Sequence, residues 1–194
     1  MLPSSGIKSV SDLVAKAKAQ PDKVSYSSAG IGNSIHLAAE QFNADVGIQA
    51  VHVPYKTGPE TDAAIMAGDV HYAWQSVPSS IALLTSGRTK GLAVTGDSRD
   101  PALPNVPSLK EAGYNVLLPD QLFGMVAPAN LPAPVLAKLN QAVQAMTADP
   151  EFQAIVRKGG GTPSQVGGDE FAKIVQRDSK LWGDLIKRLN ITPT

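Results

Sequence analysis

The segment that decides the fold runs from residue 24 to residue 46 and reads VSYSSAGIGNSIHLAAEQFNADV. Its first five residues predict a short strand, and the glycines at 30 and 32 predict a flexible turn. Asn33 or Ser34 then caps a helix that continues to Val46, with apolar side chains recurring on one face. A strand, a glycine turn and an amphipathic helix in this order are typical of an α/β protein.

Strand-like and helix-like runs alternate on both sides of that segment. The pattern predicts helices at 9–19, 59–67 and 78–85, and strands at 49–55, 70–75 and 90–95. Strands that alternate with helices favour a parallel or mixed sheet with helices on both faces. The fold class predicted for this part of the chain is therefore α/β.

The pattern changes after residue 96. Residues 97–107 hold three prolines and predict a loop. The elements predicted beyond it are a short helix at 108–112, a strand at 123–127, and helices at 133–147, 150–156 and 168–189. The end of the chain is thus helix-rich, and we expect two domains, residues 1–121 and residues 122–194.

The composition argues against several classes of protein. Among 194 residues, 17 Lys and Arg balance 17 Asp and Glu, so the chain lacks the one-signed field that nucleic-acid binding requires. Without cysteine, a disulfide, a thiolate metal site and a cysteine nucleophile are all excluded. No stretch reaches the roughly 20 apolar residues that span a bilayer. Since the N-terminus lacks the features of a secretory signal, the protein is either cytosolic or separated from its leader.

The histidines are not spaced as metal ligands, because His36, His52 and His71 fall on separate predicted elements. The glycine turn is not a dinucleotide-binding motif, since Ile35 occupies the position of the third glycine. A hydrolase or transferase that pairs His36 with Ser34 is the enzymatic alternative. Helical positions i and i+2 point about 200° apart, so this pair is not expected to act together. We therefore expect no cofactor, no metal and no catalysis.

The turn before the predicted helix at 33–46 indicates an anion site. The backbone N–H groups of residues 32–35 are expected to be unpaired, at the positive end of the helix dipole. Ser28, Asn33 and Ser34 add neutral donors, and the segment 24–46 contains no Lys or Arg. A carboxylate fits such donors better than a more highly charged phosphate. A plain strand–helix turn with an Asn cap is the alternative.

Two further strand ends carry polar residues, in the stretches 53–59 and 74–79. Ligands of open α/β sheets bind at the carboxyl ends of strands, so three such ends that converge would form a pocket. The expected ligand-binding residues are Ser28, Ala29, Gly30, Gly32, Asn33, Ser34, His36, Tyr55, Gln75 and Ser76.

Five ordered stretches resemble the motifs of one family. The first consists of residues 24–30 followed by Gly32, Ser34, His36, Leu37 and Glu40, and the others are residues 51–58, 87–95, 103–113 and 123–129. Together they extend from about residue 7 to residue 191. They are similar to motifs of the Bug/TctC family, the periplasmic solute-binding proteins of tripartite tricarboxylate transporters.

The resemblance implies a two-lobe periplasmic binding protein of type II, which closes on its ligand about a hinge. This chain corresponds to the second lobe, a type II-like α/β lobe, with a helix-rich C-terminal segment that in the family returns to the first lobe. Nothing in the chain matches the family's first lobe. The implied function is capture of a small carboxylate in the periplasm, with membrane transporter subunits as partners.

The apolar faces predicted at 133–147 and 169–189 need a covering surface, because apolar area left in water forfeits about 25 cal/mol for each Å². The tail can fold back on residues 7–121, exchange between two copies, or pack on the absent lobe. Exchange is favoured because the Gly- and Pro-rich connection supplies a hinge. We therefore expect a homo-oligomer formed through the C-terminal helices. The alternative function is an orphan half-lobe that acts as an oligomerising module with a vestigial ligand site.

Overall fold

The computed structural model describes residues 1–116 and 118–192. The chain forms two compact units. The first unit comprises residues 1–120 and 182–194, and the second unit comprises residues 121–181. The two expected domains, residues 1–121 and residues 122–194, stay a prediction.

The first unit is built on a three-stranded parallel sheet, as the alternating pattern predicts. Its strands are β1 (Ser25–Ser28), β2 (Val51–Pro54) and β3 (Tyr72–Ala73), in the order β2-β1-β3. Tyr26 lies opposite His52 on one side and Tyr72 on the other. The strands β2 and β3 are shorter than the predicted ranges 49–55 and 70–75.

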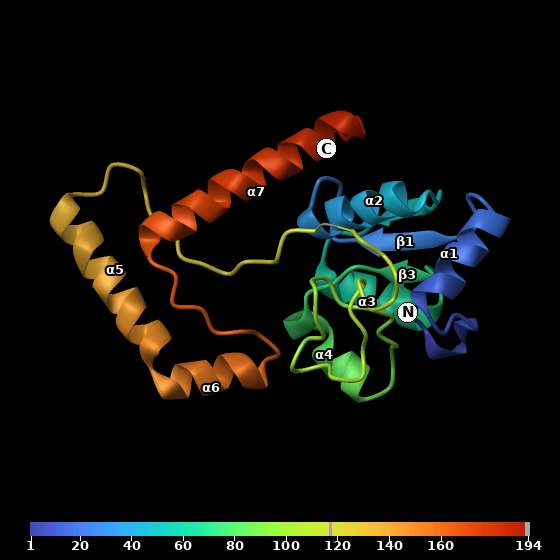
Figure 1. Ribbon diagram of the computed structural model, residues 1–194, viewed down its shortest axis with the longest axis horizontal. Helices are drawn as coiled ribbons and strands as arrows, with labels where there is room; N and C mark the ends of the chain where they lie inside the picture. Colours follow the sequence, from blue (N-terminus) through green and yellow to red (C-terminus); the bar gives the residue numbers. More distant parts are fainter. Residues whose placement is uncertain (117, 193–194) are drawn as a thin grey trace. The chain divides into compact units, whose positions relative to one another are not determined.

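Helices cover both faces of the sheet, which confirms the predicted α/β class. The helices are α1 (Val10–Ala19), α2 (Ser34–Val46), α3 (Gly58–Ala67) and α4 (Val77–Thr85), preceded by the 3₁₀ turn η1 (Pro3–Ser5). The chain moves from β1 to β2 through α2, and then back past β1 to β3 through α3. Because right-handed crossovers in opposite directions lie on opposite faces, α2 and α3 are on opposite sides of the sheet (Figure 1).

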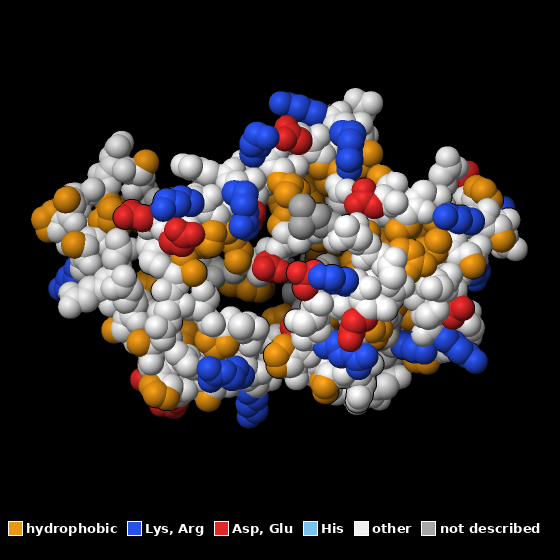
Figure 2. Space-filling model, in the orientation of Figure 1, with side chains coloured by type: hydrophobic (Ala, Val, Ile, Leu, Met, Phe, Trp, Pro, Cys, Tyr) orange, Lys and Arg blue, Asp and Glu red, His pale blue; other side chains and the backbone are white. Residues whose placement is uncertain are grey.

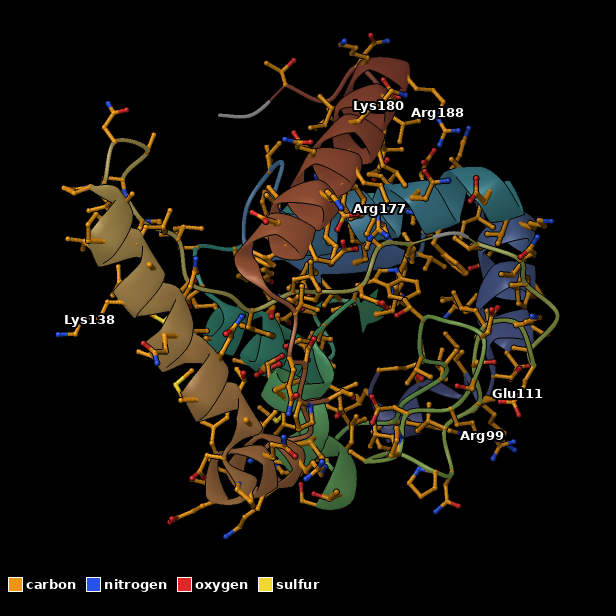
Figure 3. All side chains as sticks on the ribbon, turned by 60° about the vertical axis from the view of Figure 1, so that its left-hand side comes forward. Arg99, Glu111, Lys138, Arg177, Lys180 and Arg188 are labelled. Atoms are coloured by element: carbon orange, nitrogen blue, oxygen red, sulfur yellow. The ribbon has the colours of Figure 1, made fainter. Side chains whose placement is uncertain are left out.

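The main hydrophobic core lies on the α2 side of the sheet. Its buried side chains include Leu13 and Val14 of α1, Tyr26 of β1 and Phe42 of α2. The C-terminal end of α7 (Gly168–Arg188) also belongs to this unit. There Leu185 is buried, and the guanidinium of Arg188, labelled in Figure 3, donates to Gln41 Oε1 of α2 at 2.8 Å. A smaller cluster of Ala64, Ile65 and Val70 lies on the α3 side.

The strand predicted at 90–95 is wrong. In this stretch only Val94 pairs, in an isolated parallel bridge with Ser108. The Val94 N–H donates to the Pro107 carbonyl, and the Leu109 N–H donates to the Val94 carbonyl. Since Pro107 has no N–H to donate, the ladder does not extend toward it. The helix predicted at 108–112 is likewise a turn, and it ends at Gly113 with a φ of 87°.

A small network of charged side chains closes the loop before that turn. Arg99 and Glu111, both labelled in Figure 3, form an ion pair at 3.0 Å. Glu111 also accepts the Ser108 N–H at 2.8 Å, and Arg99 donates to the Pro104 carbonyl at 2.9 Å. These contacts hold together a segment in which prolines prevent regular hydrogen bonding.

The second unit is helical. It contains α5 (Ala133–Ala148), α6 (Pro150–Lys158) and the N-terminal part of α7, as predicted. The strand predicted at 123–127 is wrong, because no backbone hydrogen bond joins these residues to another part of the described chain. Extended backbone becomes a strand only when a partner accepts its hydrogen bonds. Gly124 lies against the ring of Phe171, so no larger residue fits there without a shift.

Apolar side chains are exposed over much of the second unit. Val126 is 89% exposed and Phe123 is 75% exposed. Others are Met125, Val135, Leu136, Leu139, Met146, Ile155, Val166 and Val175. Figure 2 shows hydrophobic side chains at the surface of the part that holds α5. No helix of the described residues is long and apolar enough to cross a membrane.

The core on the α2 side should control the stability of the first unit. Phe42 is 2% exposed and contacts the rings of Trp74 and Tyr114, so Phe42→Ala should lower the free energy of unfolding by about 3–5 kcal/mol. The control Val51→Ala removes methyl groups from a residue that is 43% exposed and should cost less than about 1 kcal/mol. Urea denaturation followed by circular dichroism measures both. Equal losses would contradict this placement of the core.

Candidate ligand-binding site

The carboxyl ends of all three strands lie at one edge of the sheet. Ser28 pairs with Pro54, and Ser27 pairs with Ala73, so the three turns that follow start side by side. The chain reverses its direction across the sheet at β1, and in sheets of the order β2-β1-β3 the topological switch point lies between β1 and β3. The structure thus brings together the three polar strand ends that the sequence indicates separately.

The glycine turn after β1 depends on backbone conformations that side chains disfavour. Gly30 has a φ of 121° and Gly32 has a φ of 79°. Asn33 has extended backbone and caps α2, as predicted, by accepting the Ile35 N–H at 2.9 Å on Oδ1. Gly30, Gly32, Asn33 and Ser34 are all at least partly exposed at this edge.

The expectation that the amides of residues 32–35 are unpaired is wrong for three of the four. The Gly32 N–H donates to His36 Nδ1 at 3.2 Å, and the Asn33 N–H donates to the Gly30 carbonyl at 3.3 Å. The Ile35 N–H donates to Asn33 Oδ1. Only the Ser34 amide of this set has no partner among the described residues. A capping side chain and a histidine one turn into the helix supply acceptors that the pattern of glycines does not reveal.

Ser28 lies beneath the turn and is fully buried. Its hydroxyl donates to the Gly30 carbonyl at 3.0 Å and accepts the Gly30 N–H at 3.3 Å. The same oxygen lies 2.7 Å from His52 Nε2. When this hydroxyl donates to the Gly30 carbonyl, the proton between Ser28 and His52 is on Nε2, which donates to Ser28. His52 is absent from the predicted set, although its place in an alternating strand could have indicated it.

His36 and His52 belong to a stack of rings on the α2 face of the sheet. The His36 and His52 ring centroids are 4.0 Å apart with an interplanar angle of 25°. Tyr26 stacks on His52 at 4.9 Å, and its hydroxyl donates to Glu40 Oε1. Tyr72 packs against Tyr26 at 5.4 Å. The glycine turn therefore rests on a packed layer of aromatic and imidazole rings.

Burial sets the charge state of this layer. Burial lowers the pKa of His36 despite the opposing effect of the Glu40 carboxylate. Burial, and the neighbouring His36, lower the pKa of His52 from its ordinary value of 6.5 to about 4. The Tyr26 hydroxyl, buried and bonded to Glu40, has a pKa far above its usual range. At neutral pH both imidazoles are uncharged.

The other predicted residues surround the same edge. Tyr55 is half-buried against the Ala64 and Ile65 cluster, and its N–H donates to the Ser28 carbonyl at 2.8 Å. Gln75 donates from Nε2 to Thr61 and Asp62 of α3. Ser76 caps α4 and donates its hydroxyl to Ser79 Oγ at 2.8 Å. Their contacts with a ligand stay predictions.

A cavity of about 380 Å³ lies elsewhere, in the second unit. Its lining consists of Asn140, Gln144, Gly167, Gly168, Asp169, Glu170 and Lys173. None of the predicted site residues belongs to it. No group of three or more His, Asp or Glu side chains within residues 1–116 and 118–192 is arranged to hold a metal ion.

The lowered histidine pKa values make the stability of the first unit depend on pH. Between pH 6.5 and about 4 the unfolded chain binds more protons at His36 and His52 than the folded chain does. The free energy of unfolding should therefore fall as the pH falls through this window. Urea denaturation at several pH values between 8 and 4.5 measures the slope. His52→Gln, which keeps a donor for Ser28, should make the slope shallower, and an unchanged slope would contradict the assignment.

The amino-acid sequence matches known proteins over almost its whole length. The family model described as the tripartite tricarboxylate transporter family receptor, TctC, matches residues 1–191. A UPF0065 protein of Pseudomonas sp. strain P51, from the tcbD-tcbE intergenic region, is 32% identical over 191 residues. That match covers 94% of this chain and 54% of the relative. The chain therefore spans about half the length of this relative.

Solved structures show the same fold. An R. palustris protein solved with adipate has a TM-score of 0.91 and 27% identity, over 100% of this chain and 64% of that protein. The periplasmic binding protein BugD has a TM-score of 0.78 and 25% identity, over 98% and 64%. These similarities confirm the predicted α/β fold, of the type found in periplasmic binding proteins. The chain belongs to the TctC family of solute-binding receptors, as its five motifs indicate.

Proposed function

We propose that this chain is the ligand-capturing lobe of an extracytoplasmic solute-binding protein that takes up a small carboxylate. The observation that carries the proposal is the carboxyl end of β1, beside the switch point between β1 and β3, where a glycine turn meets the N-terminus of α2. The adipate held by the R. palustris relative supports a carboxylate as the ligand.

The exposed part of the turn is the surface proposed to contact the ligand. Gly30, Gly32, Asn33 and Ser34 lie at the edge. The Ser34 amide, which has no partner among the described residues, is in the first turn of α2, where the helix dipole favours negative charge. Residues 24–46 contain no Lys or Arg. A carboxylate is then held by neutral dipoles, so only a modest free energy opposes its release to a transporter.

The lobe is proposed to bind without turnover. Ser28 is fully buried and engaged by Gly30 and His52, so it presents no nucleophile to a ligand. Family membership supports the same role, because the family is one of receptors. We extend the family's setting to this chain: a periplasmic location and transfer of the ligand to membrane subunits of a tripartite transporter.

The two parts of the chain are proposed to serve different surfaces. Residues 1–121 form the lobe that carries the turn. In the segment 122–194, the C-terminal end of α7 packs on that lobe, and the part before residue 182 is proposed to pack on another part of a longer protein. The exposed apolar side chains around Phe123 and Val126 support this division, because covering apolar surface with another protein surface is favourable. A lobe that forms one wall of a cleft makes only part of the contacts of a closed site, so it is expected to bind a carboxylate weakly.

Binding can be measured by thermal shift with adipate, other di- and tricarboxylates, acidic amino acids and aromatic acids, against sodium chloride at equal ionic strength. At a tenfold excess over the dissociation constant, a ligand should stabilise the first unit by about 1.4 kcal/mol. Gly32→Val should abolish this shift, because a β-branched residue strains the φ of 79°. The matched control is Gly87→Val, at a φ of 70° with open space around it and away from the turn. Binding that survives Gly32→Val unchanged would place the site elsewhere.

Self-association distinguishes the alternative function. If the exposed apolar surface is covered by a second copy, light scattering at micromolar concentration should show a dimer or a larger species. The pair Phe123→Ser and Val126→Ser should shift it toward monomer, because both side chains are more than two-thirds exposed. An oligomer that no carboxylate stabilises would favour the oligomerising module over the receptor.

A further inference from the structure

We infer that His36 is a positioning residue that holds the glycine turn in its binding shape only while its imidazole is neutral. The inference deepens the proposed function, since it rests on the turn being the carboxylate site. It gives ligand capture a pH dependence that comes from a hydrogen bond inside the protein.

The contact between Gly32 and His36 requires an uncharged ring. The Gly32 N–H donates to Nδ1 at 3.2 Å, so Nδ1 is an acceptor and the ring proton is on Nε2. A second proton on Nδ1 would set two donors against each other. Gly32 would then lose its acceptor, and the turn would have to change shape to avoid the opposing N–H groups.

The second imidazole braces the other end of the turn. Through Ser28 Oγ, His52 reaches the carbonyl and the amide of Gly30. The two rings are stacked at 4.0 Å, so a positive charge on one opposes a charge on the other. Gly30 and Gly32 are the two residues of this turn with a positive φ. Gly32 is therefore held by His36, and Gly30 is held by His52 through Ser28.

The charged groups around the pair favour the neutral state. Tyr26 of β1 faces the rings, and Tyr72 of β3 packs on the Tyr26 ring; both are neutral phenols. Glu40, one turn along α2, favours a charged His36, but burial outweighs it and the pKa of His36 is lowered. From α7, Arg188 is engaged by Gln41 on α2. Protonation therefore requires a pH below the ordinary range of histidine.

The direction in which carboxylate affinity changes with pH shows whether His36 positions the turn or attracts the carboxylate directly by its charge. If His36 touched the ligand, a charged ring would strengthen carboxylate binding at low pH. His36 is instead 5% exposed, with Nδ1 directed at Gly32. Carboxylate affinity should then fall as the pH falls, because the turn loses an internal hydrogen bond.

The chain offers a matched control in His71. Its Nδ1 accepts the Ser25 N–H at 3.2 Å, the same contact at the opposite end of β1. Burial lowers the pKa of His71 as well. His71→Asn therefore removes a titrating ring of the same kind without touching the turn. In His36→Asn, the side-chain amide places a non-titrating acceptor where Nδ1 lies in the native ring.

The first experiment needs no ligand. In ¹⁵N-labelled protein, the amide signal of Gly32 should move between pH 8 and 4.5 with the same midpoint as the ring signals of His36. His36→Asn should abolish this movement, and His71→Asn should leave it unchanged. The inference would be overturned if the Gly32 amide signal did not move with the midpoint of the His36 ring, or if it moved equally in His36→Asn.

The second experiment follows adipate affinity over the same pH range. The loss of affinity at low pH should be about two- to tenfold greater in the native chain than in His36→Asn, as expected for one hydrogen bond. His71→Asn should behave like the native chain, and the shared titration of adipate cancels in the comparison. Affinity that rises at low pH, and does so only while His36 is present, would overturn positioning. Absence of adipate binding at every pH in all three proteins would count against the proposed function alone, since the amide titration still decides the inference.

Discussion

The parallel pairing of β1 with a strand on each side is the constraint on which the rest of the structure depends. It places Ser28 beside Pro54 and Ser27 beside Ala73, so that three turns distant in sequence start at one edge. It also stacks Tyr26, His52 and Tyr72 on a single face, since residues paired across parallel strands point the same way. The ring layer, the position of the glycine turn above it and the meeting of three strand ends at one edge are consequences of that register.

Helices could be predicted from the sequence because their signals are local. Ser9, Asn33, Thr57 and Ser76 each accept a backbone N–H in the first turn of a helix, and the apolar spacing carries each helix onward. Strands could be predicted only where partners exist. The run at 90–95 has the apolar residues of a strand, yet it pairs only at Val94, because Pro107 has no N–H to donate to the next pair. The run at 123–127 has no backbone partner among the described residues.

The position of the candidate site could be predicted, but its internal bonding could not. Gly30, Gly32 and Asn33 mark a turn and a cap by their residue types alone. That Gly32 donates to His36, and that His52 lies 2.7 Å from Ser28, depends on register and side-chain direction that spacing along the chain does not specify. Family membership could be predicted from five ordered motifs, because a motif is recognised from its residues along the chain and not from their contacts in the fold.

The brevity of β3 has a consequence for how the lobe opens. Tyr72 and Ala73 are its only residues, and no residue of α4, which follows it, is fully buried. Cooperative subunits with few buried contacts open at lower free energies than the centre of a sheet. Amide hydrogens along β1 should thus exchange slowly, and those from residue 72 to residue 85 far sooner. The strand end with Gln75 and Ser76 can therefore open locally while the glycine turn stays folded, so that one side of the proposed site could adapt to the shape of a ligand while the other keeps its geometry.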